Sequence, residues 1–300
     1  MKKIIWATDG SEEAERALEY AKYLALKSGG EIIGVHVVPL AVQLLYENLS
    51  ESKENVKDWR LQIEKNAALR FEEISTKLKK VGIKFDGVIL KGKPSDKIRE
   101  IAKRRKADLI VLGKHGHGFF ESMLVGSETI KVLKGSHIPV LAVKDNKKTK
   151  AQFKKILVPI DLTHYSDTAA FYALNLAQLT GALVKVVHVL RLDMYAQDLP
   201  ASALEIVIEQ TEKALNKRVF KIKKDFENKN RSSENVKITN EVIHGMSEAV
   251  TISNYSDKNN IDLLVIHTHG RTGITRFLLG SVTERVISRS KCSVLAIRPE

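Results

Sequence analysis

Cysteine is almost missing from this chain, which has a single one, Cys292, among 300 residues. One cysteine cannot form a disulfide within the chain or supply an all-cysteine metal cluster, so we expect a reducing compartment. No run of about 18 apolar residues occurs, and residues 2–7 have the pattern of a strand rather than of a signal peptide. The sequence therefore predicts a cytoplasmic protein without a membrane anchor.

The signatures of common nucleotide and acyl hydrolases are also missing. The chain has no Gly-x-x-x-x-Gly-Lys-Ser/Thr phosphate loop, no Gly-x-Ser-x-Gly elbow and no Ser-Gly-Gly-x-Asp-Ser pyrophosphatase loop. We therefore predict no catalytic residues. A slow nucleotide hydrolase or transferase that uses Asp9 or His115 stays open as an alternative.

Positive charge is what the chain has in excess. Its formal net charge is +13, and residues 1–150 carry the larger share of it. Such a balance favours anionic partners, nucleotides among them. The densest basic cluster, Lys103-Arg104-Arg105-Lys106, falls at the expected end of a helix, where cations complement the helix dipole. We interpret it as a solvated helix end, with a nucleic-acid patch as the less favoured alternative, and expect neither nucleic acid nor a membrane as a partner.

Five apolar segments in the first half alternate with helical patterns. The expected strands cover residues 3–8, 31–38, 85–90, 108–112 and 140–143. The first helix begins after Ser11, an N-cap residue followed by acids, and stops at Gly29 and Gly30. This alternation predicts an α/β fold, with a parallel sheet covered by helices on both faces.

The second half repeats the first at a nearly constant offset. Asp161 matches Asp9 and His188 matches His36, both at an offset of 152, and later segments match at 154. A repeat along the whole length identifies a tandem duplication. We expect a first domain over residues 1–146, a linker over 147–154 and a second domain over 155–300.

A glycine-rich turn follows the fourth expected strand. Gly113 is followed after two residues by Gly116, and after nine more by Gly126 and Ser127. Glycines let the backbone turn closely around a ligand, and a helix that begins near Ser127 offers unpaired N–H groups to an anion. The pattern predicts a phosphate site.

Together these features resemble the universal stress protein family, in a tandem form with two copies on one chain. The residues that carry the resemblance are Asp9, Asp161, the pairs His36-Val37 and His188-Val189, and the glycine pattern of the first copy. The resemblance implies two open five-stranded parallel sheets of order 3-2-1-4-5, an adenine-nucleotide alpha-hydrolase-like fold with its ligand at the carboxyl ends of the first and fourth strands. It also implies that the domains pair through their last strands, residues 140–143 and 294–297, as an internal pseudo-dimer; association of two chains is a further expectation.

In this family the glycine pattern is the signature of members that hold ATP, so the resemblance implies an adenine nucleotide: ATP, or else ADP or AMP. The expected binding residues of the first copy are Ala7, Thr8, Asp9, Val37, Gly113, Lys114, His115, Gly116, Gly126, Ser127 and Glu128. Those of the second copy, which we rank lower, are Pro159, Ile160, Asp161, Val189, Thr268, His269, Gly270, Gly280, Ser281 and Val282.

The second copy departs from the signature at His267, which stands where the first copy has Gly113. We expect this side chain to intrude on the ribose or to force a different turn, since a residue other than glycine is strained at positive φ. Electrostatics favour the opposite ranking, because two arginines lie in the second loop whereas Glu121 and Glu128 lie near the first. We rank the first site higher and expect both glutamates to turn away from the phosphates.

Histidines at two-residue spacing, His115 with His117 and His267 with His269, raise the alternative of a metal site. No third ligand is visible nearby, so we expect no metal held by the protein alone, although Mg²⁺ could accompany ATP.

The leading hypothesis is a cytoplasmic, ATP-binding stress-response protein, a sensor or regulator whose occupancy changes its contacts with an unidentified partner protein. A weak hydrolase or transferase and a nucleotide-free dimerisation module stay open as alternatives. Residues 41–61 and 193–204, which follow the second strand of each copy, are expected to pack on their own domain; covering the pocket or binding a partner is the alternative.

Overall fold

The computed structural model describes residues 1–39, 53–114, 126–144, 150–191, 200–230, 236–268 and 279–298. The chain divides into two compact units, Met1–Ala151 and Gln152–Glu300. The exact bounds of the expected linker, and the pairing of the two units through their last strands, stay predictions. Within the described ranges, none of the helices combines the length and apolar character that a membrane crossing needs.

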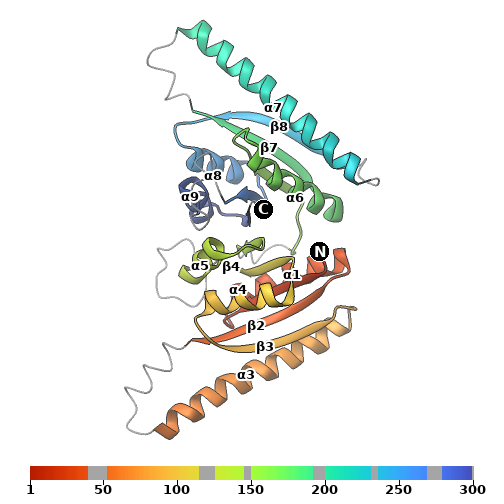
Figure 1. Ribbon diagram of the computed structural model, residues 1–300, viewed down its shortest axis with the longest axis vertical. Helices are drawn as coiled ribbons and strands as arrows, with labels where there is room; N and C mark the ends of the chain where they lie inside the picture. Colours follow the sequence, from red (N-terminus) through yellow and green to blue (C-terminus); the bar gives the residue numbers. More distant parts are fainter. Residues whose placement is uncertain are drawn as a thin grey trace. The chain divides into compact units, whose positions relative to one another are not determined.

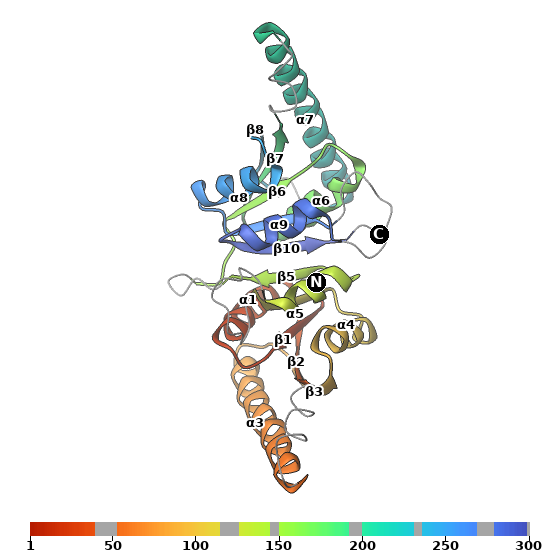
Figure 2. The same cartoon turned by 90° about the vertical axis from the view of Figure 1, so that its left-hand side faces the viewer.

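Unit 1 is an α/β domain built on one parallel sheet (Figure 1). Its elements are β1 (Lys3–Thr8), α1 (Glu12–Ser28), β2 (Glu31–Pro39), α3 (Lys53–Lys79), β3 (Phe85–Gly92), α4 (Pro94–Arg105), β4 (Leu109–Gly113), α5 (Ser127–Gly135) and β5 (Val140–Val143). The strand order is β3-β2-β1-β4-β5, and all neighbours are parallel. Helices α1 and α4 lie on opposite faces of the sheet (Figure 2). The predicted class of fold is confirmed.

Unit 2 repeats this architecture. Its elements are β6 (Lys155–Pro159), α6 (His164–Thr180), β7 (Leu183–Leu190), α7 (Ala201–Lys229), β8 (Ile238–His244), α8 (Glu248–Lys258), β9 (Leu263–His267), α9 (Ser281–Arg289) and β10 (Ser293–Ile297). The order β8-β7-β6-β9-β10 is again parallel throughout. The segments 41–61 and 193–204, expected to pack on their own domain, lie largely outside the described residues, which omit 40–52 and 192–199, so their role stays a prediction.

The central strands are buried on both faces, which explains their continuous apolar runs. In β1, the side chains of Ile4, Ile5 and Trp6 are fully buried. The following helix α1 begins where the Ser11 hydroxyl accepts a hydrogen bond from the Ala14 N–H at 3.2 Å, as the N-cap pattern predicts.

An aromatic cluster fastens α3 to the sheet of unit 1. The Phe71 ring packs edge-to-face on Trp6 and on Phe85, with centroids 6.2 Å and 5.7 Å apart. Gly34 leaves room for these rings, since a Cβ there would lie 2.6 Å from Phe85. The Trp6 indole N–H donates to the carbonyl of Ala14 at 2.7 Å, so the cluster also fixes the start of α1.

Each sheet has a topological switch point, where successive connections change face. In unit 1, β1 and β4 are neighbours, but β1 continues into a helix on one face and β4 into a helix on the other. The chain therefore leaves an opening at the carboxyl ends of these two strands, which is where ligands bind in open α/β sheets. In unit 2, β6 and β9 occupy the equivalent positions.

Candidate functional site

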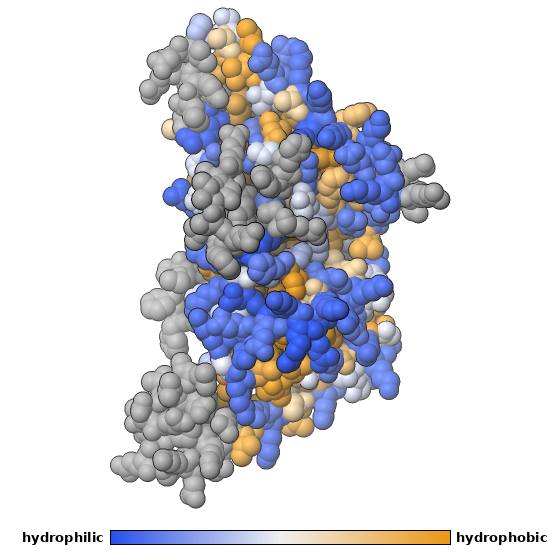
Figure 3. All heavy atoms as spheres, in the orientation of Figure 1, coloured by the Kyte–Doolittle hydropathy of each residue, from blue (hydrophilic) through white to orange (hydrophobic). Residues whose placement is uncertain are grey.

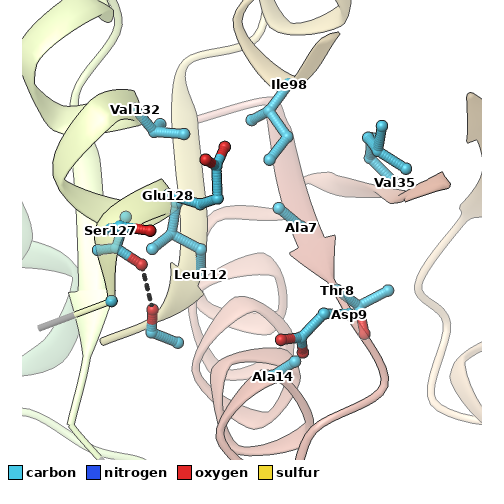
Figure 4. Close-up of a pocket in the computed structure, with 14 residues that line it drawn as sticks. Ala7, Thr8, Asp9, Ala14, Val35, Ile98, Leu112, Ser127, Glu128 and Val132 are labelled. Atoms are coloured by element: carbon cyan, nitrogen blue, oxygen red, sulfur yellow. Dashed lines mark hydrogen bonds between the residues drawn. The ribbon is translucent and has the colours of Figure 1, made fainter. Parts of the chain in front are cut away.

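A cavity of about 210 Å³ lies at this opening in unit 1. Its lining comes from strand ends and from α1, α4 and α5 (Figure 4). The lining residues are Ala7, Thr8, Asp9, Ala14, Val35, Val37, Ile98, Leu112, Gly113, Gly126, Ser127, Glu128, Thr129 and Val132. The wall is mostly apolar, with polar groups concentrated at Asp9 and at the start of α5 (Figure 4).

The cavity brings together eight of the eleven residues expected from the first copy. These are Ala7, Thr8, Asp9, Val37, Gly113, Gly126, Ser127 and Glu128. Of the other three, Lys114 is buried at the end of β4, while His115 and Gly116 lie outside the described residues. What each of them binds stays a prediction.

Six lining residues escaped the sequence analysis: Ala14, Val35, Ile98, Leu112, Thr129 and Val132. Two of them could have been predicted from the sequence. Val35 lies two residues before Val37 and so shares its face of the strand, and Val132 lies one helical turn after Glu128 and so shares its face of the helix. Ile98 carries none, since only the crossing of α4 over the sheet brings it to the opening.

The turn after β1 fixes the carboxylate of Asp9 at one wall of the cavity. Asp9 Oδ1 accepts a hydrogen bond from the Ser11 N–H at 3.0 Å, and the Thr8 hydroxyl accepts from the Gly10 N–H at 3.1 Å. Gly10 turns the chain at φ +86°, a conformation that favours glycine. Ser11 rather than Asp9 is the N-cap of α1, and Asp9 lines the cavity.

The backbone conformation of Gly10 predicts that a side chain at this position lowers the stability of unit 1. Gly10→Ala should lower the free energy of unfolding of unit 1 by about 1 kcal/mol, because a Cβ is strained at this φ even though no atom lies within 4 Å of it. In unit 2 the same turn places Leu162 at φ +63°, so Leu162→Gly should relieve a similar strain. Chemical denaturation of the whole chain checks both, and an unchanged midpoint in both variants contradicts the prediction.

The glycine-rich loop of unit 1 is fastened where it leaves β4 and where it enters α5. The Gly126 N–H donates to the carbonyl of Lys114 at 2.8 Å, and the Thr129 hydroxyl donates to the carbonyl of Gly113 at 2.9 Å. The Lys114 N–H in turn donates to Val143 O on β5 at 2.8 Å. These bonds set the start of α5 beside the end of β4.

Helix α5 begins at the cavity without a side-chain cap. Its N-cap is Gly126, and no hydrogen bond from a side chain caps the helix there. Uncapped N–H groups and the positive end of the helix dipole favour an anion at this place. Ser127 lines the same wall (Figure 4) and adds a hydroxyl group to it.

Glu128 does not turn away as expected: it lines the cavity (Figure 4). Its carboxylate accepts from the Ser95 N–H at 2.9 Å, in the first turn of α4, and from Lys131 Nζ at 2.5 Å. Burial acts to raise the pKa of Glu128, but these hydrogen bonds outweigh it and lower the pKa overall. The negative charge is thus compensated within the protein rather than removed from the site. Glu121 lies outside the described residues.

Two histidines, one in each unit, join the ends of neighbouring strands. His36 Nδ1 lies 3.1 Å from the carbonyl oxygen of Thr8, and His188 Nδ1 lies 2.8 Å from that of Ile160. A carbonyl oxygen only accepts, so Nδ1 carries the proton. Burial lowers the pKa of His36, against the opposing effects of the Thr8 hydrogen bond and the nearby charge of Asp9. A neutral His36 therefore holds β1 against β2 where both reach the cavity.

The lowered pKa of His36 predicts a loss of stability on acidification. The folded state resists protonation, whereas the imidazole in the unfolded chain titrates near its usual value of 6.5. The contribution of His36 is therefore present above pH 6.5 and is lost as the pH falls through the lower, folded-state pKa. Unfolding midpoints measured between about pH 8 and pH 5 should fall less steeply in His36→Gln than in the wild type. Parallel profiles would contradict this assignment.

Unit 2 places its expected residues at the corresponding edge. Asp161 Oδ1 accepts from the Thr163 N–H at 3.0 Å and from the Thr163 hydroxyl at 2.6 Å. The Gly280 N–H donates to Thr268 O at 2.8 Å, which fastens the loop as in unit 1. The remaining described members of the set are Pro159, Ile160, Val189, Ser281 and Val282, whereas His269 and Gly270 lie outside the described residues.

The expectation that His267 forces a different turn is wrong. Neither His267 nor Gly113 has positive φ, so no glycine is required there. The carbonyl of His267 accepts from the Thr283 hydroxyl at 2.8 Å, the same bond that Gly113 makes with Thr129. The backbone strain of unit 2 lies instead at Leu162, the position of a glycine in unit 1.

Among the described residues, no group of three or more His, Cys, Asp or Glu side chains could hold a metal ion. Of the four histidines at two-residue spacing, only His267 is described; His115, His117 and His269 are not. A metal in the loops stays an open alternative of the sequence, and nothing in the described part adds to it.

Comparison with known proteins identifies a family. The model of the universal stress protein family matches residues 1–144 and again residues 152–298. A universal stress protein of Methanocaldococcus jannaschii, MJ0577, is 33% identical over 156 residues, which cover 48% of this chain and 94% of that protein. The universal stress protein Slr1230 of Synechocystis is 26% identical over 318 residues, covering 99% of this chain and all of that protein.

A solved structure has the same fold over the full length. The universal stress protein from Archaeoglobus fulgidus DSM 4304 superposes with a TM-score of 0.68 at 22% identity, covering 99% of this chain and 96% of that one. The family match occurs twice and spans nearly every residue. The chain therefore belongs to the universal stress protein family, with two copies of the family's domain in tandem.

Proposed function

We propose that the cavity of unit 1 binds an adenine nucleotide, and that nucleotide occupancy regulates the contacts of this stress-response protein with a partner protein. The observation that carries the proposal is the combination of three features in one cavity. An apolar wall, a fixed carboxylate at Asp9 and the uncapped start of α5 meet at the crevice of the sheet. These features complement the base, the sugar and the phosphates of a nucleotide.

The proposed roles follow from the chemistry of each wall. Apolar side chains of Val35, Val37 and Ile98 exclude water from the base. The Asp9 carboxylate accepts hydrogen bonds from the ribose hydroxyls. The N–H groups that follow Gly126, with the Ser127 hydroxyl, bind phosphate. Mg²⁺ that arrives with ATP would further offset the charge of Glu128.

We propose a weaker second site in unit 2. Asp161 and the start of α9 repeat the polar features of unit 1, and Gly280 is again an N-cap without a side-chain hydrogen bond. Leu162 replaces a glycine in the turn, and the buried ring of His267 ends β9. The pairing of the two units as a pseudo-dimer, the association of two chains and a cytoplasmic location remain part of the proposal.

The nucleotide released from the purified full chain by acid tests the proposal. Chromatography should find an adenine nucleotide, and added ATP should raise the melting temperature without being turned over. Turnover that is lost in Asp9→Ala would favour the hydrolase or transferase instead. If the protein releases no nucleotide and ATP causes no thermal shift, the nucleotide-free dimerisation module is favoured.

A further inference from the structure

The opposite edge of unit 1, where the strands begin, collects positive charge. Helices α1, α3 and α4 all end there, because helices in a parallel sheet run against the strands. Hydrophilic side chains gather over α4 (Figure 3). We call this surface the basic edge; its exposed cations are Lys2, Lys27, Lys79, Lys80, Lys84, Lys103, Arg104 and Lys106.

The acidic side chains at the basic edge are already engaged. Glu31 pairs with Lys84 at 3.3 Å, and Asp86 pairs with Arg105 at 2.6 Å. Asp108 accepts from the backbone N–H of Lys3 at 2.9 Å. Within the described part of the chain, Lys103 and Lys106 form no salt bridge, while Arg104 attracts the carboxylate of Glu100, which pairs with Lys97 at 2.7 Å. The net field of this edge is therefore positive.

Unit 2 shows that the fold does not need this charge. Helix α8 ends as α4 does: Lys106 and Asn260 have φ +52° and +51°, and the next residue donates to a carbonyl five positions back in both units. Yet the four residues that correspond to 103–106 are Asp257, Lys258, Asn259 and Asn260. The same helix end forms without the basic cluster.

Lysine at position 106 is also the less favourable choice for the backbone. Asparagine tolerates the left-handed conformation better than most residues, as Asn260 does in unit 2. A helix end of this kind thus does not require Lys103-Arg104-Arg105-Lys106, and the excess positive charge suits an anionic partner.

Two exposed apolar side chains lie at the same edge. Leu26 in the last turn of α1 is 52% exposed, and Val81 just after α3 is 43% exposed. Both therefore lie where their helix ends, at the edge where the strands begin, and each is next in sequence to an exposed lysine, Lys27 or Lys80.

We propose that the basic edge docks on an anionic lipid bilayer. Clustered lysines and arginines are attracted to acidic headgroups, and exposed apolar side chains gain by entering the headgroup boundary. A nucleic-acid duplex would use the cations but leave Leu26 and Val81 without a role, so the membrane is favoured. The corresponding residue of unit 2 is the polar Gln178, which agrees with a function confined to unit 1. This surface is independent of the nucleotide cavity at the opposite edge.

Co-sedimentation of the full chain with vesicles tests this docking. The wild type should bind vesicles that contain phosphatidylglycerol and leave pure phosphatidylcholine vesicles unbound, and about 0.5 M salt should abolish binding. The double substitution Lys103→Asp and Lys106→Asn copies unit 2. It should lower the partition coefficient of the protein onto acidic vesicles at least about tenfold, because each basic residue near the membrane surface contributes to the free energy of binding. Leu26→Gln should lower it several-fold without changing the charge.

Lys221→Asp combined with Lys224→Asn on α7 is the matched control, because it changes the net charge equally on exposed positions of unit 2. This control should bind vesicles nearly as the wild type does. Equal losses in control and test variants, no binding of the wild type to acidic vesicles, or tighter binding to a DNA duplex that Leu26→Gln leaves unchanged would each overturn the proposal.

Discussion

Replacing Asp9 by alanine should weaken the binding of ATP by about 10- to 100-fold. This loss corresponds to roughly 1.5–3 kcal/mol for hydrogen bonds that a carboxylate accepts from ribose hydroxyls. Asp9 is placed for this role because its turn is fixed by the Ser11 N–H and its side chain lines the cavity. Isothermal titration of the nucleotide-free chain with ATP measures the change.

Two further variants distinguish the loss of contacts with the ligand from a disturbance of the turn after β1. Asp9→Asn keeps an oxygen that can accept from the Ser11 N–H, so a large loss in this variant reports on the charge rather than on the fold. Asp161→Ala removes the equivalent carboxylate of unit 2 and should leave the tighter binding step unchanged. Wild-type affinity for ATP in Asp9→Ala would contradict the proposed role of Asp9. Equal losses of affinity in Asp9→Ala and Asp161→Ala would contradict the ranking of the two sites.

Glu128→Val should strengthen the binding of ATP without Mg²⁺ by about tenfold. The substitution copies Val282 of unit 2 and removes a negative charge from the phosphate side of the cavity. Two unit charges several ångströms apart in a partly solvated site repel by about 1–2 kcal/mol, which sets the expected size. The variant also loses the bonds to Ser95 and Lys131, so the unfolding free energy should fall by about 1 kcal/mol.

Saturating Mg²⁺ should shrink this difference, because the cation offsets the repulsion in the wild type. Glu128→Gln is the control for shape, since it keeps an oxygen near the Ser95 N–H and removes only the charge. Titrations with and without Mg²⁺ compare the three proteins. Weaker ATP binding in both variants would mean that Glu128 contacts the ligand favourably, and the phosphate would then have to lie elsewhere.

The fold and the frame of the site were predictable because they depend on local patterns. Apolar runs alternating with capped helices fix an α/β sheet, and the repeat of Asp9 at Asp161 fixes the duplication. The order 3-2-1-4-5 that the family resemblance implies makes β1 and β4 neighbours, and their carboxyl ends then bring Asp9 and Gly126 to one edge of the sheet.

Features that depend on distant packing were not predictable. Glu128 is held by the Ser95 N–H, which lies 33 residues away on another helix. Ile98 reaches the cavity through the same crossing of α4. The strain assigned to His267 was wrong because φ at this position is set by the strand end, whereas Leu162 carries the strain. The basic edge could be recognised only by comparing the backbones of α4 and α8, because the cluster of basic residues in the sequence alone is typical of an ordinary helix end.

The central claim is that a nucleotide occupies the cavity of unit 1, and amide hydrogen exchange with and without ATP tests it most directly. The account predicts that ATP slows exchange in the turn after β1 and at the start of α5, near Gly126 and Ser127. The corresponding segments near Asp161 and Ser281 should be protected only at higher ATP concentration. Protection confined to unit 2, or no protection in either crevice at saturating ATP, would contradict it.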